Sequence, residues 1–184
     1  MKLSPLSIGG AWVAESPLHA DNRGSFREWF KQTEIFEKTG SSFHVNQANI
    51  SISSYGVVRG IHYSLSPEGQ SKWVTCLKGS ILDVIVDIRP MSPTFRKVEY
   101  VELSSSNGQA VLIGSGLGHG FASLEEDSVV SYLLSSPFSP THEHGINPFD
   151  KELGIQWDIT NPILSLKDEN APSLMSLSEA GLLP

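Results

Sequence analysis

The stretch WVTCLKGSILDVIVDI, residues 73–88, decides the fold class of this chain. The dipeptide Lys78-Gly79 divides it into two apolar segments, each of the length of a β-strand. In the second segment apolar residues stand at positions 82, 84, 86 and 88, and Asp83 and Asp87 stand between them. A period of two residues is typical of a strand whose two faces differ. The stretch therefore predicts a β-hairpin that turns at Lys78-Gly79.

Further short segments of the same kind lie on both sides of this stretch, separated by clusters of Gly, Pro, Asn and Ser. They are residues 50–53, 57–63, 98–103, 110–113 and 128–134. Helix is scarce: residues 32–39, which end before Gly40, are the best candidate, and residues 174–183 are a second one. Many short strands at close spacing predict an all-β sandwich or barrel with a few short helices.

The composition limits the classes of protein to which the chain can belong. Its 184 residues contain no repeat or low-complexity tract, so we expect a single domain over residues 1–184. The net charge of -7 argues against nucleic acid as a partner. No apolar run is long enough to span a membrane, and the first residues lack the layout of a secretory signal. The single cysteine, Cys76, cannot form an intramolecular disulfide, so we expect a soluble, cytoplasmic protein.

Two of the six histidines lie in strand-like sequence that is punctuated by glycine. His62 ends the segment GVVRGIH, and His119 lies within GSGLGHGF, where the glycines leave the backbone open to close approach. A lone histidine in such a place is as easily a hydrogen-bonded core residue as a functional group. The residues alone leave both interpretations open.

The spacing around both histidines resembles the two half-motifs of the cupin superfamily, which implies a jelly-roll β-barrel. The positions that match these half-motifs are Gly56, His62, Glu68, Gly108, Gly116 and His119. Ser64 stands where the first motif has a second histidine, and Gly114 stands where the second motif has a proline. The remaining set of His62, Glu68 and His119 would give a divalent ion fewer ligands than metal-binding cupins supply. We therefore interpret the chain as a cupin that has lost its metal.

A closer resemblance covers nearly the whole chain. The motifs that carry it are DNRGSFRE (21–28), QANIS (47–51), RGIHY (59–63), Lys72, residues 79–89, GHGF (118–121) and Lys167-Asp168. Their order and spacing resemble those of the dTDP-4-dehydrorhamnose 3,5-epimerases. The resemblance implies a homodimeric enzyme without metal or cofactor that converts dTDP-4-keto-6-deoxyglucose to dTDP-4-keto-L-rhamnose. The chain departs from the family's usual residues at Ala48, Gly114 and Gly118, which bear on substrate preference.

The chemistry of this reaction explains the residues that the resemblance implies for catalysis. The hydrogens on C3 and C5 flank the C4 ketone, so each can leave as a proton if a base reaches it and the enolate oxygen is stabilised. By resemblance His62 is the base, supported by Asp168, and Tyr132 is the proton donor on the opposite face. Lys72, with His119, would stabilise the charge on O4. Without the resemblance, Tyr132 would be interpreted as a strand aromatic and Asp168 as a solvated acid.

The resemblance also implies which residues bind the nucleotide half of the substrate. Arg23, Arg59 and Lys167 match contacts to the pyrophosphate and the sugar, and guanidinium groups suit phosphate oxygens. Phe138 matches the aromatic residue that stacks on thymine. The other members of the implied binding set are Phe26, Glu28, Gln47, Asn49 and Glu143.

Arg59 and His62 are three residues apart, so a regular strand would point their side chains to opposite faces. If both contact one substrate, the strand must be bulged or must end near Gly60.

Three alternative functions stay open. A single-site epimerase would act at C3 or C5 only, a metal-dependent cupin oxygenase or isomerase would retain an ion, and a carbohydrate-binding jelly roll would bind without catalysis. Product stereochemistry, metal content and deuterium exchange with solvent would distinguish them.

Overall fold

The computed structural model of the protein describes residues 1–67 and 69–184, and β-strands dominate this part of the chain. The strands are β1 (Lys2–Pro5), β2 (Ala11–Glu15), β3 (His19–Asp21), β4 (Gly24–Phe26), β5 (Gln47–Ser53), β6 (Val58–Ser64), β7 (Lys72–Lys78), β8 (Ser80–Asp87), β9 (Val98–Ser104), β10 (Gln109–Ile113), β11 (Leu117–Ser123), β12 (Ser128–Leu134) and β13 (Glu143–Gly145). The helices are α1 (Gln32–Thr39), α2 (Leu166–Glu169) and α3 (Leu174–Glu179). Within the described ranges, no helix is long and apolar enough to cross a membrane.

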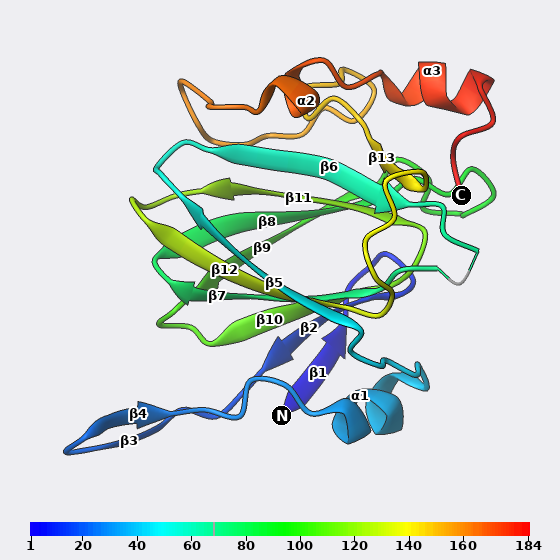
Figure 1. The fold of residues 1–184 in the computed structure, drawn as a ribbon. Coiled ribbons are helices and arrows are strands. Elements are labelled where there is room, and N and C mark those ends of the chain that lie inside the picture. Colours follow the sequence, from blue (N-terminus) through cyan, green and yellow to red (C-terminus); the bar gives the residue numbers. More distant parts are fainter. Residues whose placement is uncertain (68) are drawn as a thin grey trace.

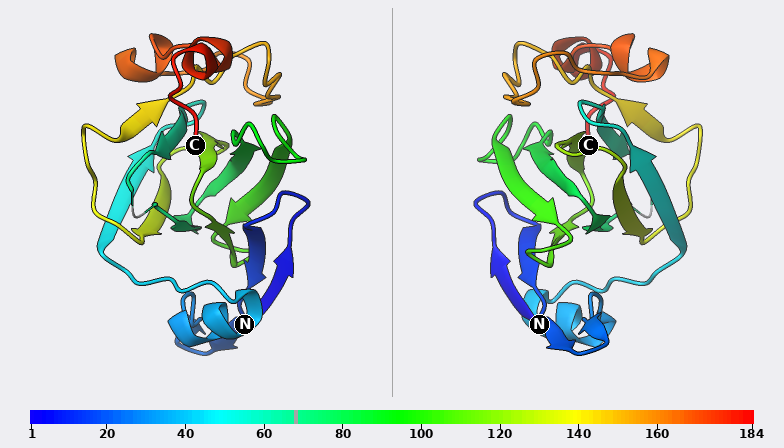
Figure 2. Two further views of the ribbon diagram at one scale, coloured as in Figure 1. Left: turned by 90° about the vertical axis from the view of Figure 1, so that its right-hand side faces the viewer. Right: turned by 90° about the vertical axis from the view of Figure 1, so that its left-hand side faces the viewer.

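Two antiparallel sheets face each other across the core (Figure 1). One has the strand order β1-β2-β10-β7-β12-β5, and the other has the order β13-β6-β11-β8-β9. The views along the strands show that the two sheets enclose a common interior (Figure 2). Side chains from both sheets, such as Val74 and Val130 from one and Ile81 and Ile85 from the other, form a single buried cluster there. This is the layout expected for a jelly-roll barrel.

The predicted hairpin over residues 73–88 is wrong in its pairing, although both of its strands exist. β7 lies between β10 and β12, whereas β8 lies between β11 and β9 in the other sheet. Gly79, with a φ of +75°, is the corner at which the chain passes from one sheet to the other. Because both strands have an inward apolar face, packing the two faces against each other across the core buries them as well as pairing would.

The other predicted strands lie within β5, β6, β9, β10 and β12, and the helix over residues 32–39 is confirmed as α1. α1 ends because Gly40 adopts the left-handed conformation and its amide bonds to the carbonyl of Phe36. The second predicted helix is shorter than expected and ends at Glu179. The elements that were not predicted are β1, β2, β3, β4, β11, β13 and the short helix α2. Of these, β3 and β4 are exposed throughout and offer no apolar face.

The C-terminal part of the chain covers the outer face of the β13-β6-β11-β8-β9 sheet, with α2 and α3 lying above β6 and β13 (Figure 1). Trp157, Leu174 and Leu177 pack there against Val84 and Val86. Both faces of β8 are therefore buried: Ile81, Asp83 and Ile85 face the barrel interior, and the intervening residues face this cover.

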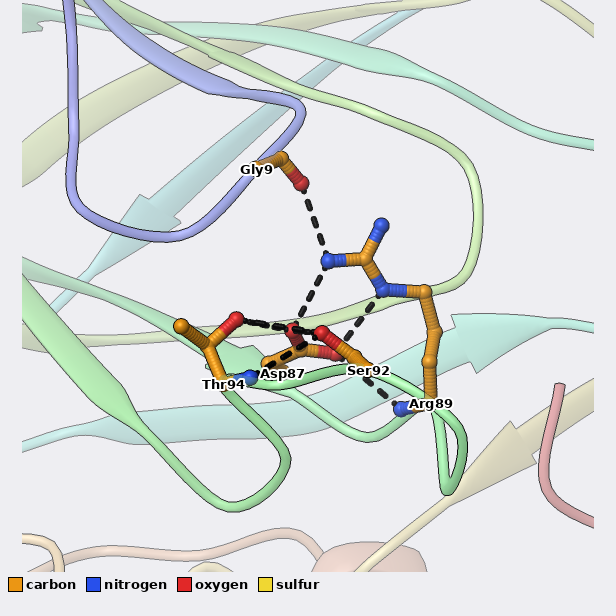
Figure 3. A network of polar contacts seen from close by, with 5 residues as sticks. All are labelled: Gly9, Asp87, Arg89, Ser92 and Thr94. Atoms are coloured by element: carbon orange, nitrogen blue, oxygen red, sulfur yellow. Dashed lines mark hydrogen bonds and ion pairs between the residues drawn. The ribbon is translucent and has the colours of Figure 1, made fainter.

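An ion pair between the buried Asp87 and the partly exposed Arg89 ties two loops of the barrel together (Figure 3). Arg89 donates from Nε and Nη2 to the Asp87 carboxylate at 2.8 Å each, and Nη2 also donates to the Gly9 carbonyl at 2.9 Å. Ser92 and Thr94 donate hydroxyl hydrogen bonds to the same carboxylate. Burial by itself would raise the pKa of Asp87, but these hydrogen bonds lower it well below its ordinary value. The network joins the β1–β2 turn to the β8–β9 connection.

Candidate active site

A cavity of about 300 Å³ opens between the two sheets, and most of the predicted site residues line it. The predicted catalytic residues among its lining are His62, Lys72, Tyr132 and Asp168. The predicted binding residues among its lining are Asn49, Arg59, His119, Phe138, Glu143 and Lys167. These residues come from strands of both sheets and from α2 and the loop after β12, so only the folded barrel brings them together.

The wall formed by the β1-β2-β10-β7-β12-β5 sheet follows from strand alternation. Lys72 is two residues before Val74, which faces the core, so the lysine also points inward. Tyr132 is paired with Val74, and Asn49 is paired with Tyr132 on the far side of β12. Paired residues share a face of a sheet, so Val74, Tyr132 and Asn49 form one row across the cavity wall.

Gln47 supports this wall from beside the cavity. Its amide donates to Asn49 Oδ1 at 2.9 Å, and its Oε1 accepts from the Phe138 amide at 2.8 Å. Gln47 thereby holds two lining residues, and Phe138 stands half-exposed at the mouth of the cavity.

The opposite wall contains the bulge that was expected near Gly60. His62 pairs with His119, but Arg59 pairs with Phe121, so β6 uses three residue steps where β11 uses two. Gly60 has a φ of +122°, and a Cβ there would lie 2.5 Å from the Gly120 Cα, so the position requires glycine. The extra residue turns Arg59 to the same side as His62, and both line the cavity.

His62 is bonded to the buried carboxylate of Asp168. His62 Nε2 lies 2.7 Å from Asp168 Oδ1, and the Asp168 amide is held by the hydroxyl of Ser165, the N-cap of α2. Burial raises the pKa of Asp168, but the hydrogen bond and the charge of His62 outweigh it and keep this pKa below its ordinary value. A carboxylate that accepts from Nε2–H leaves the lone pair of the imidazole on Nδ1, and the ring is 35% exposed toward the cavity.

A second histidine and aspartate pair lies deeper, and its carboxylate was missed from the sequence. His119 Nε2 lies 2.8 Å from Asp83 Oδ2, and both side chains are buried. Asp83 Oδ1 has no hydrogen-bond partner among the described residues. The signal was present in the sequence, because a charged residue on the inward face of an apolar strand needs a partner.

Lys72 is the buried cation of the site. It is 8% exposed, and its Nζ donates across the barrel to the His62 carbonyl at 3.2 Å. Burial lowers the pKa of Lys72 to about 8, and the negative charges of Glu143 and Asp83 oppose that fall. The ammonium form therefore still predominates near neutral pH, where it can stabilise a developing negative charge.

Three of the predicted binding residues, Arg23, Phe26 and Glu28, lie away from the cavity. The β3–β4 hairpin projects from the barrel (Figure 1), and the chain returns to the barrel at Trp29 and Phe30. Arg23 pairs with Asp21 in the same hairpin, Glu28 pairs with Lys31, and Phe26 is exposed. We expect this segment, with Arg23 and Glu28, to complete the site of the partner in a homodimer, and that expectation stays a prediction.

The cupin metal set is not assembled in the part of the chain that is described. Both His62 and His119 use Nε2 to bond a carboxylate, and Glu68 lies outside the described residues. Among residues 1–67 and 69–184, no group of three or more His, Cys, Asp or Glu side chains could hold a metal ion.

The departures from the family's usual residues have local structural reasons. A Cβ at Gly118 would lie 2.6 Å from Ile61 Cγ2, so the glycine makes room for that side chain. The Gly114 amide donates to the Gly10 carbonyl at 2.9 Å, a bond that a proline could not make. Ala48 is exposed on the edge strand β5.

Comparison with known proteins agrees with this geometry. Residues 5–176 match the family model described as dTDP-4-dehydrorhamnose 3,5-epimerase. A dTDP-4-dehydro-6-deoxyglucose 3-epimerase of Streptomyces bikiniensis is 45% identical over 99% of this chain and 93% of its own. A dTDP-4-dehydrorhamnose 3,5-epimerase of Mycolicibacterium smegmatis is 44% identical over 100% of this chain and 91% of its own.

Solved structures give the same result. An epimerase of Mycobacterium tuberculosis superposes with a TM-score of 0.97 at 41% identity, covering 100% of this chain and 94% of that one. A Legionella pneumophila epimerase in complex with dTDP-4-keto-L-rhamnose superposes with a TM-score of 0.93 at 35% identity, covering 100% and 97%. These matches confirm the predicted all-β cupin jelly roll, and the chain belongs to the dTDP-4-dehydrorhamnose 3,5-epimerase family.

Proposed function

We propose that this protein converts dTDP-4-keto-6-deoxy-D-glucose to dTDP-4-keto-L-rhamnose by inverting C3 and C5. The observation that carries the proposal is the meeting, in one cavity, of a carboxylate-bound histidine, a tyrosine from the opposite sheet and a buried lysine. Epimerisation next to a ketone needs a base, an acid on the other face and a cation for the enolate oxygen, and these three groups match those needs.

In the proposed mechanism His62 removes the proton from the carbon next to the ketone. Nδ1 takes the proton, and the carboxylate of Asp168 stabilises the resulting imidazolium. The electrons of the C–H bond move to O4, where the Lys72 ammonium and His119 stabilise the enolate. Tyr132 then delivers its hydroxyl proton to carbon from the opposite wall, and the phenolate regains a proton from solvent. The His62 imidazolium releases its proton to solvent, and the second carbon is then inverted in the same way.

The cations and the aromatic ring near the mouth suit a nucleoside diphosphate. Arg59 and Lys167 would bind the pyrophosphate, and Phe138 would stack on the thymine base. The complex of the Legionella relative with dTDP-4-keto-L-rhamnose supports a substrate of this class.

A homodimer is the arrangement that gives the projecting hairpin a role. Arg23, Phe26 and Glu28 would enter the cavity of a second copy and complete its binding set. The exposed apolar side chains of Ile50 and Ile52 on the edge strand β5 support burial against another chain. A fully active monomer in analytical ultracentrifugation would contradict this arrangement.

A single-site 3-epimerase is the second candidate, because the Streptomyces bikiniensis relative with that name is as similar to this chain as the 3,5-epimerases are. Incubation with dTDP-4-keto-6-deoxyglucose in deuterated water, followed by NMR, distinguishes the two. Deuterium at both C3 and C5 with inversion supports the proposal. Deuterium at C3 alone supports the single-site enzyme, and binding without exchange would contradict both.

Several expectations from the sequence stay predictions. These are the single domain over residues 1–184, the cytoplasmic location, and catalysis without a metal or cofactor. Activity that is lost with a chelator and restored by a divalent ion would contradict the last and would favour a metal-dependent cupin.

A further inference from the structure

Two polar side chains beside Lys72 take no part in the proton transfers described above. Gln70, which precedes β7 and is only 6% exposed, donates from Nε2 to Glu143 Oε1 at 3.1 Å. The same Nε2 lies 3.5 Å from the Ser136 carbonyl, so the amide is held at two points. Glu143 opens β13 opposite Ser64, two residues along β6 from His62, and it faces the cavity.

Ionisable groups face Lys72 from every element that packs around the cavity. They are Arg59 and His62 of β6, Asp83 of β8, His119 of β11, Tyr132 of β12, Glu143 and His144 of β13, and Lys167 and Asp168 of α2. Asp168 and Asp83 are each bonded to a histidine, whereas the hydrogen bond that Glu143 accepts comes from a neutral amide. Of these three carboxylates, Glu143 is therefore the one that is not hydrogen-bonded to an imidazole.

We propose that Gln70 and Glu143 form a positioning pair that keeps Lys72 charged. Gln70 holds the Glu143 carboxylate toward the cavity, and the carboxylate stabilises the ammonium group across it. The catalytic consequence rests on the proposed function, in which the ammonium stabilises the enolate oxygen. The electrostatic part concerns the free protein and holds whatever the substrate is.

The charge state of Lys72 depends on the opposing effects of burial and of the nearby carboxylates. Burial lowers the pKa of Lys72 to about 8, and Glu143 and Asp83 limit the fall. Without the Glu143 charge, the pKa of Lys72 would fall further, and a larger fraction of the molecules would carry a neutral lysine that cannot stabilise an enolate.

The test compares Glu143→Gln, which removes the charge at nearly constant shape, with Gln70→Leu, which removes the donor and leaves the charge. Glu102→Gln, an exposed residue of β9, controls for the change in net charge. The Lys72 titration is followed by NMR of ¹⁵N- and ¹³C-labelled lysine, with Lys72→Arg to assign the signal. Thermal unfolding checks that each variant is folded.

We expect Glu143→Gln to lower the Lys72 midpoint by about half a unit or more, and the alkaline limb of kcat to fall with it. Gln70→Leu should shift both in the same direction by less, and Glu102→Gln should shift neither. An unchanged midpoint in Glu143→Gln would overturn the proposal, and so would a rise in KM alone, which marks a simple substrate contact. If Glu143→Gln does not fold, an unshifted midpoint in Gln70→Leu overturns it. Because the NMR titration needs no turnover, an inactive wild-type protein would refute the proposed function without affecting this test.

Discussion

Replacing Lys72 with methionine is expected to stabilise the protein while removing its activity. Burial lowers the pKa of this lysine from 10.5 to about 8. Because one unit of pKa corresponds to about 1.4 kcal/mol, holding the ammonium inside the folded barrel costs about 3 kcal/mol at neutral pH. Methionine has a similar length and no charge. It forfeits the hydrogen bond to the His62 carbonyl, which is worth about 1 kcal/mol, so the net gain is about 2 kcal/mol.

The dependence of this gain on pH has a definite sign. The folded-state pKa is below the unfolded one, so the unfolded chain binds more protons between about pH 8 and pH 10.5. The free energy of unfolding of the wild-type protein therefore rises with pH across that window as the cost of burying the charge disappears. The advantage of Lys72→Met is full below pH 8 and vanishes near pH 10, where the remaining cost of burying the charge equals the roughly 1 kcal/mol of the lost hydrogen bond.

The assay is urea denaturation at pH 7 and pH 10, together with deuterium exchange into the substrate. Exchange should fall by about 100 to 1,000-fold, the usual effect of removing one group that stabilises an oxyanion. Lys78→Met is the matched control, because Lys78 ends the same strand but is exposed, and it should change stability by less than about 0.5 kcal/mol and leave exchange intact. A Lys72→Met protein that is less stable than wild type at pH 7, or equally active, would refute the reasoning.

Three further changes test other parts of the structure. His62→Ala should reduce deuterium exchange at C3 and C5 by about 100 to 10,000-fold with little loss of dTDP binding, and exchange at the wild-type rate would show that another group is the base. The Tyr132→Phe variant should still exchange the proton on the first carbon for deuterium, but the deuteron should return from the original face. NMR should therefore find deuterium without inversion, and a fully inverted product would show that another residue is the acid. Asp87→Asn should lower the free energy of unfolding by about 2 kcal/mol at pH 7, because it weakens the charge-assisted hydrogen bonds that the buried carboxylate accepts from Arg89, Ser92 and Thr94, and the difference should shrink as acid protonates the wild-type carboxylate. A variant as stable as wild type in urea would contradict the role of this network.

Local patterns in the sequence predicted seven of the thirteen strands that the structure describes, and the family resemblance predicted most of the residues that line the cavity. Alternation with a period of two is a local property, so it identified β8 and the segment of β12 that carries Tyr132 without any knowledge of their neighbours. The motifs around His62 and Lys167-Asp168 identified the family in the same way, since they depend on residue types in a fixed order. An irregularity near Gly60, either a bulge or a strand end, was also predicted on the condition that Arg59 and His62 contact one substrate, and the structure has the bulge.

The tertiary structure alone decided which strands became neighbours and which buried groups became partners. A turn at Gly79 is compatible with a hairpin or with a corner between sheets, and only closure of the whole barrel selects the corner. The same holds for the bonds of His119 to Asp83 and Gln70 to Glu143, which join residues 36 and 73 positions apart. The bond of His62 to Asp168, by contrast, was expected from the family resemblance. Alternation along a strand determines the face on which a side chain lies. Which side chain lies opposite it depends on packing between distant segments, and this packing lowers the free energy only when the two sheets close into the barrel.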